Sequence, residues 1–154
     1  MMRGAIEGLI RTVSPIMAQA VVITLEREMP EAAAAYAKAT SGKALGRELD
    51  RLDYAARCRN VAAITSLLSE SQAALVAQLR EAGFDPAKMR LAAEQWFPAA
   101  DGIKTINALI EQVTAKLNDF KQPNPILRDL NAAAALLSAA EAAGVRFHFT
   151  KVIT

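Results

Sequence analysis

The residues best suited to covalent or acid–base chemistry are one cysteine and one histidine, Cys58 and His148. Cys58 lies between Arg57 and Arg59, whose guanidinium groups could stabilise a thiolate, and His148 could then act as its base. The flanking sequence matches no known nucleophile–base motif. We therefore expect Cys58 to be a small apolar residue on a buried helix face.

Metal and enzyme motifs are absent from the sequence. One cysteine and one histidine cannot build a zinc cluster, a multi-histidine site or an intrachain disulfide. Carboxylates occur in near pairs, Glu26 with Glu28 and Asp50 with Asp53, but the interleaved arginines indicate solvated ion pairs on a helix surface. The sequence contains no glycine-rich phosphate loop, no Gly-x-Ser-x-Gly elbow and no His-Glu-x-x-His helix. We therefore expect a non-enzymatic protein without metal or cofactor.

A basic stretch is the main charge asymmetry of the chain. Its members are Lys38, Lys43, Arg47, Arg51, Arg57 and Arg59. The five from Lys43 to Arg59 are candidate contacts for nucleic acid. Helical spacing would place Lys43, Arg47 and Arg51 on one side of a helix, where they could contact phosphates. Acidic residues alternate with them, and the whole chain, with 18 basic and 16 acidic residues, carries only +2. We expect a solvated face, and nucleic-acid binding is the alternative.

The C-terminal stretch is the feature that most favours a binding function. Residues 145–150 alternate apolar and polar side chains, which is typical of a half-buried β-strand. Phe147 and Phe149 should face apolar surface, and the polar residues between them should face the other way. The candidate interaction residues are Val145, Phe147, His148, Phe149 and Val152.

This lone strand needs partners for its backbone N–H and C=O groups. They could come from the N-terminal segment of the same chain, or from another copy or another protein by strand addition. On the polar side of a paired strand, His148 could make assembly sensitive to pH.

Helical periodicity dominates the rest of the chain and defines the elements that must position these residues. Apolar residues spaced by three and four predict a helix over 103–120, with a seam of Ile103, Ile106, Ile110, Val113, Leu117 and Phe120. A second stripe follows Asn124-Pro125 and consists of Ile126, Leu130, Ala133, Leu137 and Ala140. We expect helices 103–120 and 125–143 to form an antiparallel hairpin, with the seam positions from Ile106 to Leu117 almost fully buried.

The N-terminal half predicts further helices. The run Thr12–Leu25 holds 14 uncharged residues, fewer than the roughly 20 that span a bilayer. We expect a core helix that begins at Ser14-Pro15 and continues to Arg27, after a short helix over residues 3–11. Membrane insertion of this run is a third possible function.

Three more segments carry helix signals. Residues 31–40 predict an alanine-rich helix, and alanine clusters at 32–35 and 132–135 suit two helices in close approach. Residues 43–82 predict one helix or two, with a break between Arg57 and Ser69 and a capping box at Ser69-x-x-Gln72. Asp85-Pro86 should begin a short helix that ends near Phe97.

Together these signals predict an all-α fold, a bundle of about five or six helices over residues 1–144 with an extended tail over 145–154. The expected function is a non-enzymatic interaction or assembly module that acts as an oligomer or as a component of a larger complex, such as a virion. Its partners would be protein chains, identical or different. We expect it in the cytoplasm or within such an assembly, because a secretion signal would be interrupted by Glu7 and Arg11.

Overall fold

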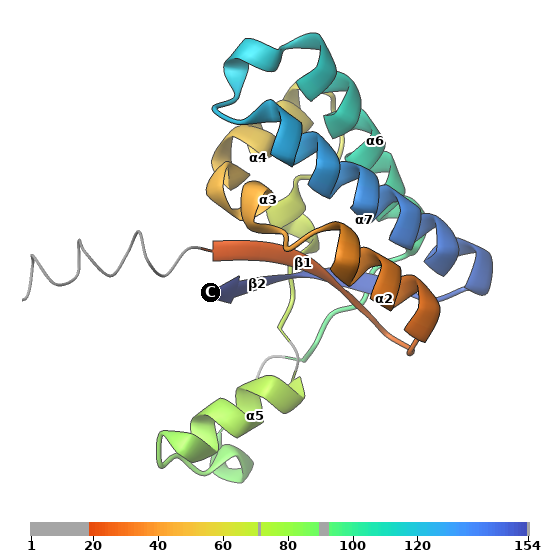
Figure 1. The fold of residues 1–154 in the computed structure, drawn as a ribbon. Helices are drawn as coiled ribbons and strands as arrows, with labels where there is room; N and C mark the ends of the chain where they lie inside the picture. Colours follow the sequence, from red (N-terminus) through yellow and green to blue (C-terminus); the bar gives the residue numbers. More distant parts are fainter. Residues whose placement is uncertain (1–18, 71, 90–92, 154) are drawn as a thin grey trace, which may run out of the picture.

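The computed structural model describes residues 19–70, 72–89 and 93–153. Within them lie six α-helices and one two-stranded antiparallel sheet (Figure 1), so the predicted helical fold with a C-terminal strand is confirmed. The elements are β1 (Gln19–Leu25), α2 (Pro30–Ala39), α3 (Lys43–Arg47), α4 (Leu49–Cys58), η1 (Ile64–Leu67), α5 (Gln72–Glu81), η2 (Pro86–Lys88), α6 (Ala99–Ala115), η3 (Leu117–Asp119), α7 (Pro123–Ala143) and β2 (Phe147–Ile153).

Helices α6 and α7 form the predicted hairpin and lie side by side in Figure 1. The α7 stripe is confirmed, because all five of its members are fully buried. The α6 seam is only partly confirmed. Ile106, Val113 and Phe120 are buried, whereas Ile110 is half-buried and Leu117 is exposed. The helix ends at Ala115, before Leu117, and its buried face instead includes Leu109.

The N-terminal half departs most from the prediction. Gln19–Leu25 is strand β1, so the expected core helix over this stretch is wrong. β1 pairs antiparallel with β2, with Cα partners from Gln19 and Ile153 to Leu25 and Phe147. The expected helix over residues 3–11 and the helix start at Ser14-Pro15 lie outside the described residues.

Several local predictions are confirmed. α2 packs on α7 through the two alanine clusters, and Gly144 ends α7 in the left-handed conformation, with φ 68°. The chain leaves its helical path after Cys58, within the expected 57–69 interval, and it breaks again at Glu48 between α3 and α4.

The helix expected from Asp85-Pro86 to Phe97 is wrong in extent. The single 3-10 turn η2 covers only Pro86–Lys88, and residues 93–96 have no helical structure. Asp85 does cap this turn, since its side chain accepts a hydrogen bond from the Ala87 N–H at 3.1 Å. In the part of the chain that is described, no helix is long and apolar enough to cross a membrane.

Candidate functional site

The tail residues predicted to bind a partner lie mostly inside this chain. Val145, Phe147, His148 and Phe149 are all buried, and Val152 alone of the five is exposed, at 38%. Phe147 and Phe149 share one face and meet edge to face, with ring centroids 5.2 Å apart. Their apolar role is as predicted, but the surface they cover belongs to the same chain. In this structure their side chains are not accessible to a partner.

His148 lies on the opposite face of β2, yet it is also fully buried, because Glu94 and Trp96 pack against it. Its Nε2 is 2.5 Å from Glu94 Oε2, and its ring lies 4.7 Å from the Trp96 ring. Its Nδ1 is 3.2 Å from Thr150 Oγ1, which in turn is 2.7 Å from Thr24 Oγ1. This polar network attaches residues 94–96 to the sheet. At His148, the polar face of β2 is therefore covered by another segment of the same chain.

The edge of β2 that does not pair with β1 binds two chain segments that lie far apart in the sequence. Phe97 and Phe147 exchange both backbone hydrogen bonds, at 2.8 and 2.9 Å. Ser69 N–H donates to the Phe149 carbonyl at 3.0 Å, and Ser69 Oγ accepts from Gln95 N–H at 2.8 Å. The Gln72 side chain of the predicted capping box lies outside the described part of the structure. β2 is therefore the base from which the chain leaves at Ser69 and to which it returns at Gln95.

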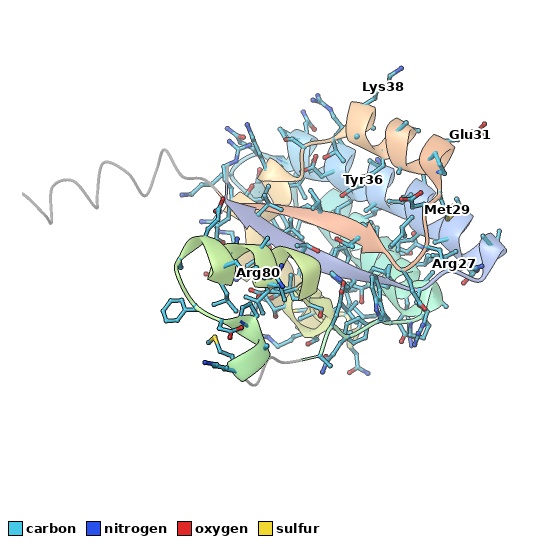
Figure 2. The ribbon with its side chains drawn as sticks, turned by 90° about the horizontal axis from the view of Figure 1, so that it is seen from below. Arg27, Met29, Glu31, Tyr36, Lys38 and Arg80 are labelled. Atoms are coloured by element: carbon cyan, nitrogen blue, oxygen red, sulfur yellow. The ribbon has the colours of Figure 1, made fainter. Side chains whose placement is uncertain are left out.

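Between these two attachment points lies an arm, residues 72–89, which contains α5 and η2. Figure 1 shows α5 standing apart from the helices of the body, and Figure 2 shows it, with Arg80, in front of the sheet. The chain reverses at Gly83, where φ is +86° and a Cβ would be strained. Phe84 is 57% exposed and Met89 is 43% exposed. The arm thus exposes two large apolar side chains, Phe84 and Met89, to solvent on a segment that stands apart from the helices of the body.

The structure separates the five predicted basic contacts. Arg51 pairs with Glu48 at 3.4 Å, and Arg59 pairs with Glu111 at 3.2 Å. Lys43 and Arg47 instead line a hollow together with Lys38 of α2 and Arg128 of α7. Arg57 is exposed at the end of α4. The five therefore do not form one continuous stripe.

Two carboxylates near the basic stretch, Glu48 and Asp53, are buried. The expectation of a solvated side chain is therefore wrong for Asp53, whereas Glu48 does pair with Arg51. Glu48 is 7% exposed and accepts the Lys121 and Gln122 N–H groups at 2.7 and 3.2 Å, which fixes the start of α7. Asp53 is also buried and accepts the Thr65 hydroxyl at 2.7 Å.

Cys58 is exposed at the end of α4, so the expectation that it is buried is wrong. His148 is buried in β2, where its ring nitrogens contact Glu94, Phe149 and Thr150. The described contacts therefore do not bring the two residues together as a nucleophile and its base.

An apolar cleft of about 420 Å³ opens between β1, α2 and α7, beside the residues labelled Arg27, Met29 and Tyr36 in Figure 2. Burial raises the pKa of Tyr36 to about 12, and the Ile23 backbone acts in the opposite direction. Among the described residues, the Tyr36 hydroxyl is the buried side-chain atom without a hydrogen-bond partner of regular geometry.

An exposed ion pair connects the end of β1 to the start of β2. Arg146 Nε and Glu26 Oε2 are 2.5 Å apart, and a second bond of 3.0 Å makes the pair bidentate. The hydrogen bond from Arg146 lowers the pKa of Glu26, and the same contact raises the pKa of Arg146.

Comparison with the models of known protein families finds no match, and comparisons with curated proteins and with solved structures find none either. Function is therefore inferred from the geometry of this chain alone.

Proposed function

We propose that this chain is a non-enzymatic self-association module in which the arm, residues 72–89, packs against the arm of a second copy. The observation that carries the proposal is the exposure of Phe84 and Met89 on a projecting element. Exposed apolar groups that are gathered on one element mark interaction surfaces more often than scattered ones do. Contact between two copies would remove these side chains from water on both sides at once.

The charges of the arm favour an identical partner. Its described charged residues are Arg80, Glu81, Asp85 and Lys88, two basic and two acidic, so that its net charge is zero. Two such surfaces do not repel each other, and a two-fold axis can place each arginine near an acidic residue of the other copy. A strongly basic or acidic arm would instead have favoured a partner of opposite charge.

β2 has an indirect role in this proposal. Its backbone holds Ser69 and Phe97, and His148 holds Glu94, so both ends of the arm are fixed to one strand. A fixed base lowers the entropy cost of presenting the arm to a partner. The predicted interaction residues of the tail thus serve assembly by positioning the arm.

The test is the mass of the full chain in solution, measured by light scattering over a range of concentrations. We expect the wild type to approach twice the 16.5 kDa of one chain. The double variant Phe84→Ser/Met89→Ser should stay at the monomer mass. The matched control is Tyr54→Ser/Leu117→Ser, which removes two side chains of similar exposure, 64% and 45%, from the body.

Three outcomes would contradict the proposal. The first is a wild type that stays monomeric at every concentration. The second is an arm variant with the same mass as the wild type, and the third is a control variant that dissociates as much as the arm variant does. Circular dichroism of each variant checks that a change in mass does not come from unfolding.

A further inference from the structure

A second surface of the molecule carries a concentrated positive charge. Four basic side chains surround one open hollow of about 480 Å³, and they come from three elements that lie far apart in the sequence. Lys38 lies in the last turn of α2, Lys43 and Arg47 lie on α3, and Arg128 lies on α7. All four are exposed, and Figure 2 shows Lys38 at the end of α2, directed away from the sheet.

The floor of the hollow is fixed by a buried carboxylate, Asp129, which is 5% exposed. One of its oxygens accepts the Thr40 hydroxyl, and the other accepts the Ala44 and Leu45 N–H groups at 3.1 and 3.3 Å. Both oxygens of Asp129 are thus occupied by the fold. Because Asp129 joins α7 to the start of α3, the basic side chains on these two helices start from fixed positions.

The loop between α2 and α3 is equally constrained. Gly42 has φ +73°, and a Cβ at this position would lie 2.1 Å from the Val21 carbonyl oxygen. Its N–H donates to Thr40 Oγ1 at 3.0 Å, and its carbonyl accepts the Val21 N–H at 3.0 Å. Only glycine fits here. The hydrogen bonds to β1 and Thr40 hold the rim of the hollow in one shape.

The ion pairing elsewhere distinguishes this cluster from an ordinary solvated surface. Arg51, Arg59 and Arg146 each have an acidic partner. The four cations of the hollow form no ion pair within the described residues, although they converge on one opening. With Asp129 counted, four positive charges and one negative charge leave +3 at the hollow, more than the +2 of the whole chain. Such a concentration of like charge is unfavourable until an anion neutralises it.

We infer that this hollow binds a compact polyanion with adjacent phosphate groups, a diphosphate or polyphosphate. Its volume falls in the range of small-molecule sites. Arginine at two sides of a hollow suits bidentate contact with phosphate oxygens, and lysine adds mobile point charges. None of the described residues that line the hollow is aromatic, so they offer no platform for stacking bases. These features favour a small polyanion over an extended nucleic acid.

The test is calorimetric titration of the full chain with inorganic pyrophosphate. We expect saturable binding of one pyrophosphate per chain that weakens as salt is raised. The variant Arg47→Gln/Arg128→Gln should weaken binding about tenfold or more, because two charge-assisted contacts are lost. The control Arg57→Gln/Lys104→Gln removes the same charge from exposed positions outside the hollow and should bind like the wild type.

A second pair of variants separates charge from folding. Arg47→Lys/Arg128→Lys keeps the charge and should retain more affinity than the glutamine variant, while thermal unfolding shows whether each variant is folded. Orthophosphate should bind more weakly than pyrophosphate. Binding of orthophosphate as tight as that of pyrophosphate, or equal loss in the control variant, would overturn the inference. So would a wild type that binds a short DNA duplex but not pyrophosphate.

Discussion

Gly102 lies directly beneath the Phe147 ring, and this contact allows a quantitative test of how the tail packs on the helices. A Cβ at position 102 would lie 2.4 Å from Phe147 Cζ, 2.8 Å from Phe147 Cε1 and 3.0 Å from Leu137 Cδ1. All three distances are too short for carbon atoms in van der Waals contact, which requires about 3.5–4.0 Å. Gly102→Ala must therefore displace the Phe147 ring or part of α6.

The expected cost combines two opposing terms. Overpacking of a rigid core costs about 1–3 kcal/mol, whereas alanine is favoured over glycine in a helix by about 0.5–1 kcal/mol. The net effect of Gly102→Ala is a destabilisation of up to about 2.5 kcal/mol. Phe147→Leu removes the ring atoms that the new methyl would strike. In that background Gly102→Ala should be neutral or stabilising, because the methyl fills part of the space that the ring leaves.

The assay is a double-mutant cycle, with free energies of unfolding taken from urea denaturation. We expect a coupling of about 1–3 kcal/mol between positions 102 and 147. The control cycle replaces Phe147→Leu with Phe84→Leu, the same chemical change at an exposed ring on the arm, and should show no coupling. Additivity within about 0.5 kcal/mol at positions 102 and 147 would refute the packing of β2 on α6.

Three further predictions follow from the same structure. Removal of residues 145–154 should abolish cooperative unfolding. Each buried phenylalanine of β2 contributes about 3–5 kcal/mol, and the total stability of a domain is only about 5–15 kcal/mol. A truncated chain with the urea midpoint of the wild type would contradict this prediction. Glu26→Gln should lower the free energy of unfolding at neutral pH, and this loss relative to the wild type should shrink as the pH falls below 4.5. The reason is that the hydrogen bond from Arg146 lowers the pKa of Glu26 only in the folded chain. A loss that is independent of pH would contradict the prediction. Tyr36→Phe should leave stability unchanged or higher, because the buried hydroxyl lacks a regular hydrogen-bond partner. The same change should remove the ultraviolet titration step near pH 12. A loss of stability above about 1 kcal/mol would show that the hydroxyl forms a hydrogen bond in the folded chain.

The helical part of the fold could be predicted because its signals are local. The α7 stripe and the left-handed Gly144 can each be identified within one or two helical turns of sequence. The two alanine clusters allow α2 and α7 to approach closely, and composition alone indicated that contact. Leu117 was misplaced because the spacing of apolar residues continues past the point where the helix stops.

Strand β1 was missed because periodicity is ambiguous in a stretch that is apolar on both faces. Val21 is buried on one face and Ala20 on the other, so apolar and polar residues do not alternate. Its four successive β-branched residues, 21–24, were the available signal for a strand. A strand also needs a partner, and the partner of Gln19 is Ile153, at the opposite end of the described chain.

The two proposed sites were hidden from the sequence for related reasons. The hollow combines Lys38 with Arg128, two residues that no local sequence pattern connects. Its floor is fixed by Asp129, a carboxylate that belongs to no motif in the sequence. The arm could be predicted as a helix, but its separation from the body follows from where Ser69 and Phe97 bind β2.

The alternation of the tail therefore indicated a strand correctly, while its functional meaning depended on which segments occupy its two edges. β1 occupies one edge along its whole length, and Leu68 and Phe97 form bridges on the other. Strand addition by a second chain would first have to displace one of these segments. Among the exposed large apolar side chains of the described residues, Phe84 and Met89 belong to the arm that β2 holds in place, and these two form the assembly surface that we propose. A change in β2 that keeps the core intact but loosens Ser69 or Glu94 should thus weaken self-association without unfolding the helices.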